Sequence, residues 1–408
     1  MVRLMARSGR YSWVGSMLDR RAFLELCAAL GVSVPALGAV SGCAGSQANA
    51  NPDSELSKVI IVGAGAGGLT AGYLLKQRGI PFQILEAASQ HGGRMKQLTG
   101  FADFPVPLGA EWIHVDARIL QEIVNDPSVR VDIDTVQYDH DGDVARYNGD
   151  DIPLRAVGFT DDSKFVNATW FEFFQRYIVP SVAPHTVYNA VVRGIDYRGD
   201  TVAVTTQDQT YTADRVVVSV PVKMLQQGRI DFVPALPAAK QAAIDTVQVW
   251  DGCKAFIAFR EPFYPTMTAL DIVPETAGQK LYYDAAYGQQ SGQHILGLFA
   301  VGAGCTPYHD RTDAERIAHM LAELDDLFDG AASRNYIKHV FQDWGNEPFI
   351  GGAYVVDHED WRRVRTLGQS VSGRVFFAGT AYTEGDDWSS VHTAARSAIR
   401  AVDELVAG

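Results

Sequence analysis

Cysteine is scarce in this chain, and its spacing points to no shared site. Four cysteines lie at positions 27, 43, 253 and 305 of 408 residues. None belongs to a CxxC motif or stands at ligand spacing from a histidine, and the ten histidines are scattered. A disulfide framework or a zinc site would need such spacing. The sequence therefore predicts neither of them, and no metal ligand is assigned.

Basic residues are outnumbered and do not cluster. Lys and Arg total 35 against 48 Asp and Glu, which gives a formal net charge of −13. Nucleic-acid binding depends on grouped basic side chains that neutralise phosphates, so this class of partner is excluded. The GxSxG and P-loop motifs are absent as well. Redox chemistry carried by a cofactor remains as the main candidate.

The strongest positive signal is residues 58–85, KVIIVGAGAGGLTAGYLLKQRGIPFQIL, which read as strand, helix and strand. Residues 58–62 are short, β-branched and apolar, as in a buried strand. Residues 69–78 have helical periodicity, and Gly79 ends the helix. Residues 82–85 form the second strand. This order predicts a nucleotide-binding βαβ unit.

The glycines between the first strand and the helix match the fingerprint of a dinucleotide site. Gly63 suits the tight turn, Gly65 lets the backbone approach a diphosphate, and Gly68 allows close packing of helix on strand. Ala66 and Gly67 lie between them, where the diphosphate would meet the helix N-terminus. Such a turn can also serve packing alone. The agreement of both strands and the helix with the motif favours the dinucleotide.

Two further features indicate which dinucleotide is bound. Glu86 ends the second strand, where a carboxylate can accept hydrogen bonds from both ribose hydroxyls, and no basic residue is there to favour a 2′-phosphate. Gly92, Gly93 and Arg94 follow as a second glycine loop with a cation for phosphate. This arrangement resembles the flavin-containing amine oxidases, which share a GGR after the ribose acid. Gln90 stands where that family usually has an arginine.

The resemblance implies an α/β fold with a Rossmann-type FAD-binding domain and a second, shortened α+β substrate domain. It covers residues 58–114 and 186–408 and leaves 116–185 unmatched. The composition, 47% hydrophobic and 20% charged, agrees with a globular chain of about two domains. The FAD-binding domain is expected from residues 56–115, 186–235 and 366–408, and the substrate domain from residues 116–185 and 236–365.

The resemblance also implies further contacts with FAD beyond the two glycine loops. They come from a segment beside the flavin ring, a valine that meets the adenine, the ribityl-binding strand and a helix that aims its positive end at the flavin pyrimidine. These residues are Gly109, Ala110, Glu111, Trp112, Val192, Trp344, Gly379, Thr380 and Val391. The FAD is expected to be non-covalent, because Ala353 stands where some relatives tether the flavin through cysteine.

Lys254 is the first candidate at the substrate end of the site. It lies on an alternating strand, with Phe256 and Ala258 on the same face. A strand lysine is usually a surface charge, but this segment resembles the family strand that carries a lysine beside flavin N5. The resemblance implies that Lys254 holds a water there. Loss of hydration could also let it serve as a base.

Three more residues are candidates for the same end. Tyr354 is expected to form one face of the aromatic cage around the amine. Trp388 is expected to lean in from the other side, because Ser390 or Val391 occupies the place of the usual second aromatic. Both rings could instead be packing aromatics. His114 resembles a histidine of polyamine oxidases, and its alternative is a buried histidine without a catalytic part.

Residues 1–43 resemble an export signal. Arg20-Arg21 with Phe23-Leu24 before an apolar run is similar to a twin-arginine signal, and Val40–Cys43 is similar to a bacterial lipobox. Cys43 would then carry a lipid, with residues 44–55 as a tether. The expected location is the periplasm or cell envelope, reached in folded form. The alternative is an ordinary amphipathic helix.

The leading interpretation is an FAD-dependent amine oxidase. A hydride from the C–H bond beside the nitrogen passes to flavin N5, water hydrolyses the imine, and oxygen or another acceptor reoxidises the flavin. An amino-acid oxidase or desaturase on the same scaffold is an alternative, and the former would need an arginine for the carboxylate. A further alternative is a flavin-binding partner protein without activity.

Overall fold

The computed structural model describes most of the chain that follows the predicted signal. It covers Leu56 and residues 58–138, 144–147, 150–153, 162–270, 278–356, 361–385, 387 and 389–408. The predicted signal and tether, residues 1–55, lie outside the described residues, and so does Trp388. The described residues belong to one unit, Ser54–Gly408.

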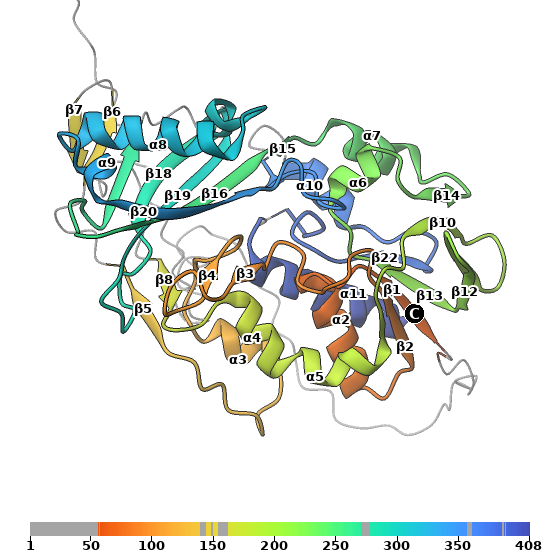
Figure 1. Cartoon of the computed structure of the whole chain (residues 1–408). Coiled ribbons are helices and arrows are strands. Elements are labelled where there is room, and N and C mark those ends of the chain that lie inside the picture. The colour runs from red at the N-terminus through yellow and green to blue at the C-terminus, as the bar shows by residue number, and fades with distance from the viewer. Residues whose placement is uncertain are drawn as a thin grey trace, which may run out of the picture. The chain divides into compact units, whose positions relative to one another are not determined.

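A parallel sheet of five strands contains the βαβ unit (Figure 1). Its order is β22-β13-β1-β2-β9, and each neighbouring pair is parallel. Both predicted strands of the unit are confirmed, and the helix begins at Ala66, three residues before the predicted start. The strands are β1 (Val59–Val62), β2 (Phe82–Leu85), β9 (Thr186–Val187), β13 (Arg215–Val218) and β22 (Val375–Phe377).

The two faces of this sheet enter different hydrophobic cores. Val59 and Ile61 of β1 pack with the helices α2 (Ala66–Gln77) and α11 (Val391–Ala407). Ile60, the intervening residue, packs on the opposite side against a second sheet and three short helices. All four residues of β1 are buried, as expected for a strand covered on both faces. The helices on the second side are α6 (Val222–Gln226), α7 (Ala238–Thr246) and α10 (Trp361–Gly368).

The second sheet has the order β12-β11-β10-β14. Residues 187–195 do not form one continuous strand, because the chain leaves the parallel sheet after β9 and starts β10 at Val192. Asn189 between them has a φ of 57°, and its N–H donates to the carbonyl of Ala88 at 3.0 Å. The strands are β10 (Val192–Asp196), β11 (Val202–Thr206), β12 (Thr210–Ala213) and β14 (Asp231–Val233).

A third sheet of seven strands has the order β20-β16-β19-β18-β17-β6-β7. Figure 1 shows α8 (Asp313–Leu327) lying across one face of it. The helix begins with a capping box in which Thr312 and Glu315 satisfy each other's backbone N–H. Other elements on this face are η3 (Ala303–Tyr308) and α9 (Ala331–Asn335). The strands are β6 (Val144–Tyr147), β7 (Asp150–Pro153), β16 (Gly252–Phe259), β17 (Met267–Leu270), β18 (Gly278–Asp284), β19 (His294–Gly302) and β20 (Tyr336–Asp343).

The central strand β16 is buried along its whole length. Its alternate residues separate as predicted. Cys253 and Ile257 belong to the core beneath α8, whereas Phe256 and Ala258 belong to a core on the other face. Lys254 shares that second face, which is the one that borders the site described below.

The described parts of residues 116–185 divide between two places in the fold, because β6 and β7 belong to the seven-stranded sheet and three helices pack elsewhere. Helices α3 (Ile119–Val124), α4 (Trp170–Tyr177) and α5 (Val179–Val182) share the hydrophobic core of α2 and the parallel sheet. The aromatic face of α4 is buried there, so its rings are core residues. The division into two domains remains a prediction.

Short paired elements complete the described chain. None of the described helices is long and apolar enough to span a membrane. These elements are β3 (Gln97–Leu98) with β4 (Val106–Pro107), β5 (Thr135–Gln137) with β8 (Ser163–Phe165), β15 (Val249–Trp250) with β21 (Tyr354–Val355), and the turn η2 (Ala183–His185).

Candidate functional site

One large cavity, about 1310 Å³ in volume, connects the glycine loop after β1 with the seven-stranded sheet. The predicted catalytic residues Lys254, Tyr354 and His114 line it. All the residues predicted to contact FAD line it too, except Gly68. Residues far apart in sequence therefore meet around a single space.

The glycine loop is shaped for a ligand at one position and for packing at another. A Cβ on Gly68 would lie 1.9 Å from the carbonyl oxygen of Gly63, so this glycine allows the helix to pack on the strand. A Cβ on Gly65 would have no neighbouring atom within 4 Å. Gly65 is the N-cap of α2 and lines the cavity. The free space beside a helix N-terminus suits a diphosphate.

Glu86 is fixed at the end of β2. Its Oε2 accepts from the N–H of Ala64 at 2.6 Å, and its Oε1 accepts from the N–H of Ala88 at 2.8 Å. Burial raises the pKa of Glu86, and these backbone N–H groups oppose the increase. The carboxylate lines the cavity beside the glycine loop, where it can accept hydrogen bonds from a ribose.

Arg94 supplies positive charge to the same cavity. Its guanidinium donates to Thr380 Oγ1 at 2.7 Å and to the carbonyl of Ala353. Burial lowers the pKa of Arg94 to about 10, so it stays charged at neutral pH. Both acceptors are uncharged, which leaves its charge available to a diphosphate.

The C-terminal segment brings a second helix N-terminus to the cavity. The N–H of Gly379 donates to Ser397 Oγ at 2.8 Å, which holds the end of β22 against α11. Ser390 and Val391, at the start of the 17-residue helix α11, line the cavity. The positive end of the helix therefore faces this space.

Gly109 brings the segment beside the predicted flavin ring into close contact with the GGR loop. A Cβ there would lie 1.9 Å from the carbonyl oxygen of Arg94 and 2.8 Å from the ring of Trp344. The Trp344 Nε1–H donates to the carbonyl of Leu108 at 2.9 Å. These contacts hold the wall that includes Ala110, Glu111 and Trp112. Val192 lines the cavity from β10, beside a bulge.

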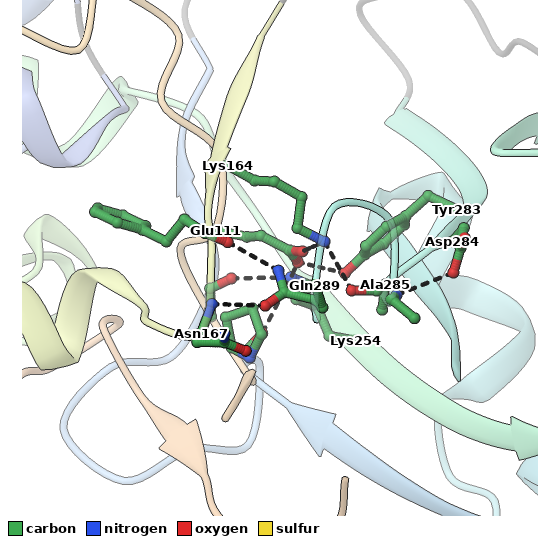
Figure 2. A network of polar contacts seen from close by, with 12 residues as sticks. Glu111, Lys164, Asn167, Lys254, Tyr283, Asp284, Ala285 and Gln289 are labelled. Atoms are coloured by element: carbon green, nitrogen blue, oxygen red, sulfur yellow. Dashed lines mark hydrogen bonds and ion pairs between the residues drawn. The ribbon is translucent and has the colours of Figure 1, made fainter. Parts of the chain in front are cut away.

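The ammonium of Lys254 makes three hydrogen bonds to other groups of the protein (Figure 2). Its Nζ donates to the carbonyls of Pro107 and Gly109 at 3.1 and 3.2 Å and to Glu111 Oε2 at 2.6 Å. An ammonium has three N–H donors, so no donor remains for the water that the sequence reading assigned to it. Burial lowers the pKa of Lys254, but the adjacent Glu111 carboxylate opposes that change and favours the ammonium. The arrangement therefore favours a fixed cation over a base.

Glu111 lies between two lysines, which sequence reasoning did not foresee. Figure 2 shows Lys164 and Lys254 approaching its carboxylate together with Tyr283. Lys164 Nζ lies 3.5 Å from Oε1, and the Tyr283 hydroxyl donates to Oε2 at 2.5 Å. The two lysine charges outweigh burial and lower the pKa of Glu111 below its ordinary value. Besides its predicted contact with FAD, Glu111 is the carboxylate that pairs with both lysines.

Lys164 and Tyr283 had no sequence signal that would pair them with Glu111. Lys164 lies in the segment that the family resemblance leaves unmatched. Tyr283 is one of several aromatic residues in an alternating strand. A small cavity of about 10 Å³ touches both Lys164 and Glu111, which is near the lower limit for one water molecule.

Tyr354 and His114 lie on different parts of the cavity wall. Tyr354 belongs to β21, whose pairing with β15 fixes it, and burial raises the pKa of its hydroxyl. His114 Nδ1 lies 3.0 Å from Asp162 Oδ2, and 46% of its side chain is exposed. The buried histidine considered as an alternative is therefore not what the structure contains. Trp388 lies outside the described residues.

These features together fit FAD. The glycine loop and Glu86 suit the adenosine diphosphate half, Arg94 the diphosphate, and the N-terminus of α11 the flavin. No group of three or more metal-ligating side chains comes together within the described residues. A family model described as flavin containing amine oxidoreductase matches residues 183–406. The chain belongs to this family. A model of an NAD(P)-binding Rossmann-like domain matches residues 61–126. The protein is thus a flavin-dependent amine oxidase with FAD as its cofactor.

Known relatives match different shares of this amine oxidase. Polyamine oxidase 2 of Arabidopsis thaliana is 23% identical over 438 residues, which cover 85% of this chain and 87% of that protein. Lysine-specific histone demethylase 2 of Homo sapiens is 31% identical over 199 residues, 47% of this chain and 24% of that protein.

Solved structures share the fold. A triple mutant of putrescine oxidase superposes with a TM-score of 0.72 at 16% identity, covering 86% of this chain and 99% of that one. Cyclohexylamine oxidase from Brevibacterium oxydans IH-35A superposes with a TM-score of 0.70 at 15% identity, covering 86% of this chain and 100% of that one. The Rossmann-type α/β fold is confirmed.

Proposed function

We propose that this amine oxidase acts on a small amine that carries an apolar substituent and is bound in its uncharged form. The observation that carries the proposal is the lining of the cavity beside Lys254. Met267, Leu281 and Phe299 reach it from three strands of the seven-stranded sheet, and Tyr354 reaches it from β21. Apolar walls stabilise a hydrocarbon group and disfavour an unpaired ammonium.

The residues of the chain position the reacting amine. When bound, FAD accepts a hydride from the carbon beside the nitrogen, which leaves an imine that water hydrolyses. Tyr354 flanks the amine, and the apolar walls limit the access of water until the product forms. Lys254 holds a positive charge at this end through its bonds to the protein. Oxygen or another acceptor then takes the electrons.

An amine fits the cavity better than an amino acid does. The arginines that line it among the described residues are Arg94, Arg193 and Arg229. Arg94 is engaged with Thr380 and Ala353. Arg193 belongs to β10 and Arg229 precedes β14, two strands that pair in the four-stranded sheet. None of these arginines comes from the sheet that carries Lys254, so a clamp for a substrate carboxylate is disfavoured there.

Anaerobic titration of the purified yellow protein tests this proposal. Primary and secondary monoamines, polyamines and L-amino acids would each be added, and bleaching of the flavin absorbance recorded. We expect monoamines with apolar substituents to bleach at the lowest concentrations. Bleaching by amino acids alone would contradict the proposal. A yellow protein that no amine bleaches would instead favour a flavin-binding partner role, after FAD has been added back to any colourless fraction.

We also propose that the FAD is held without a covalent bond. The support is Ala353, which has no sulfur to offer at the position where some relatives attach the flavin. Acid precipitation should leave the yellow colour in the supernatant. Colour that remains in the pellet would contradict this proposal.

We propose further that residues 1–43 direct export in folded form to the periplasm or cell envelope. The support is Arg20-Arg21 before an apolar run and the lipobox-like Val40–Cys43. Cell fractionation of the Arg20→Lys/Arg21→Lys variant should find the protein retained in the cytoplasm. Cys43→Ala should release it from the membrane fraction without stopping export. Unchanged fractions for both variants would contradict the proposal.

A further inference from the structure

The four residues Lys164, Lys254, Glu111 and Tyr283 form a buried group that we call the charge cluster. They come from β8, β16, the segment after β4, and β18. The side chains of Glu111 and Lys254 are 3% exposed, and that of Lys164 is 4% exposed. Four separate parts of the chain thus bring two lysines and one carboxylate together out of water. Glu111 and Lys254 line the large cavity, whereas Lys164 and Tyr283 are not among its lining residues.

The charge cluster is unbalanced. Two lysines share one carboxylate, and Tyr283 adds no charge, because burial raises the pKa of its hydroxyl. Lys164 also donates to the carbonyl of Ala285 at 2.7 Å. With both lysines protonated, the cluster carries one excess positive charge, which the Asp284 carboxylate outside the cluster offsets in part. An uncompensated buried charge is costly, so such an arrangement is typical of a site that meets a negative charge on its ligand.

The hydrogen bonds inside the charge cluster are uneven as well. Lys254 and Tyr283 both donate to Glu111 Oε2. The other oxygen, Oε1, has no hydrogen-bond partner among the described residues, and its closest ion-pair contact is Lys164 at 3.5 Å. Glu111 therefore binds Lys254 firmly and Lys164 loosely. The ammonium of Lys254 also lies 5.1 Å from the centre of the Trp112 ring, which lines the cavity.

We propose that Glu111 and Lys164 are positioning residues that keep Lys254 an ammonium and give this wall of the cavity a net positive charge, which stabilises the negative charge that a bound flavin gains on reduction. The proposal rests on the proposed function only in that FAD occupies the cavity. It does not depend on which amine is the substrate. Lys254 acts as a fixed cation whose three donors are held by the protein, in the manner of a preorganised electrostatic site.

Other ionisable groups near the charge cluster are Tyr138 and Asp284. The ring of Tyr138 lies 5.6 Å below the Lys164 ammonium, and burial raises the pKa of its hydroxyl. Asp284 accepts from the N–H of Ala286 at 2.9 Å. Burial lowers the pKa of Lys164, and the negative charges of Glu111 and Asp284 oppose that change. The lysines and Glu111 are thus the groups of the cluster whose charge a substitution would change.

The midpoint potential of the bound flavin tests the proposal without any amine. It would be measured by photoreduction in the presence of a reference dye. Lys164→Met removes one positive charge and leaves the pair of Glu111 and Lys254 intact, so the potential should become more negative. Lys254→Met should shift it further in the same direction. Lys280→Met is the matched control, since it removes a mostly buried lysine on the opposite face of the same sheet, and it should leave the potential unchanged.

A Lys164→Met variant that retains FAD with the potential of the wild type would overturn the proposal, and so would an equal shift in Lys280→Met. Failure of the proposed function would give a different result. No amine would then bleach the flavin, but the midpoint potential of Lys164→Met would still differ from that of Lys280→Met.

The pH dependence gives a second test. Glu111→Gln keeps the shape of the side chain and leaves two buried lysines without a carboxylate. One of them should then lose its proton at a lower pH than in the wild type, because burial and the like charge both disfavour the ammonium. The potential of this variant, followed over the pH range in which the protein stays folded, should show an additional ionisation that the wild type lacks. Parallel curves for the two proteins would contradict the role of Glu111. If Glu111→Gln does not bind FAD, the comparison of Lys164→Met with Lys280→Met still decides the proposal.

Discussion

The two faces of the seven-stranded sheet contain the same three kinds of side chain in different arrangements. On the α8 face, Lys280 donates to Glu323 Oε1, and the Tyr282 hydroxyl donates to Oε2 at 2.8 Å. Each carboxylate oxygen has one donor. On the cavity face, Lys254 and Tyr283 share one oxygen of Glu111, and a second lysine approaches the other.

We interpret the Lys280–Glu323 pair on the α8 face as structural and the charge cluster on the cavity face as functional. Glu323 joins α8 to β18 with one lysine for one carboxylate, and its side chain keeps 22% of its surface exposed. The charge cluster is more deeply buried and has one lysine in excess. A protein gains nothing in stability from such an excess. The excess positive charge can instead stabilise a negative charge on a ligand in the adjoining cavity.

The largest effect is expected for Lys254→Met, which removes the cation on the cavity face. FAD should still bind, because the glycine loop and Arg94 are untouched. Flavin reduction by amine should slow on the order of 10²-fold, the usual loss when a preorganised electrostatic partner is removed. Stopped-flow measurement of reduction and reoxidation checks this. Lys280→Met should retain both rates, and wild-type rates in Lys254→Met would make Lys254 structural.

Tyr354→Ala should have the next largest effect. It removes an aromatic wall of the cavity, so amine binding and orientation should weaken, with turnover falling by about tenfold, equivalent to about 1.4 kcal/mol. Flavin content, measured by absorbance, should be unchanged. Tyr282→Phe is the control on the other face, where only a hydrogen bond to Glu323 is lost. Equal turnover in the wild type and Tyr354→Ala would remove Tyr354 from the substrate site.

Lys240 is a buried lysine outside both faces of the seven-stranded sheet, and its protonation makes the stability of the protein depend on pH. Lys240 donates to the carbonyls of Leu367 and Gln369 at 2.6 Å each, and burial lowers its pKa to about 7. The unfolded chain, with a lysine pKa of about 10.4, therefore binds more protons than the folded one above pH 7. The unfolding free energy should rise with pH in that range, by up to about 1.4 kcal/mol per pH unit.

Lys240→Met removes the contribution of the Lys240 proton to the pH dependence of the unfolding free energy. Urea unfolding of both proteins from pH 7 to 10 should show the wild type gaining stability relative to the variant as the pH rises. The flavin potential of the variant should equal that of the wild type, because Lys240 does not line the cavity. A stability difference that is constant across this range would show that the proton of Lys240 is held equally in the folded and unfolded chain.

The smallest effect is expected for the ion pair on the α8 face. Lys280→Met should lower the unfolding free energy by about 1 kcal/mol, since the pair is partly exposed and its net contribution is small. Thermal unfolding of the FAD-bound protein checks this value. A loss several times larger would mean that the pair stabilises the sheet as strongly as a core residue does, and the contrast between the two faces would then fail.

Much of the fold follows from local sequence. The βαβ unit, the alternation of β16 and the helix α8 each have a period that a short segment expresses by itself. The face of Lys254 was therefore predictable. Its partners were not, because Glu111 and Lys164 are 143 and 90 positions away and only the folded chain brings them to β16. The water predicted for Lys254 was assigned without knowledge of these partners.

Two other features of the fold could not be predicted from the sequence pattern. The left-handed Asn189 divides one apolar stretch into β9 and β10, a bend that alternation alone does not reveal. Helices α3, α4 and α5 follow no family motif, and their place on the core of the parallel sheet depends on distant apolar residues. Sequence reasoning thus located the dinucleotide end of the site more completely than the end beside Lys254.

Strand β16 is hydrogen-bonded on both sides, to β19 and to β20, and this pairing fixes its register in the sheet. Two ladders fix how far Lys254 lies along the sheet, so the reach of its ammonium is set by backbone geometry and not by a loop that can adjust. A deletion of one residue within β16 would exchange its faces. The cavity would receive the small, uncharged side chain of a neighbour, and the lysine would be turned into the apolar layer beneath α8.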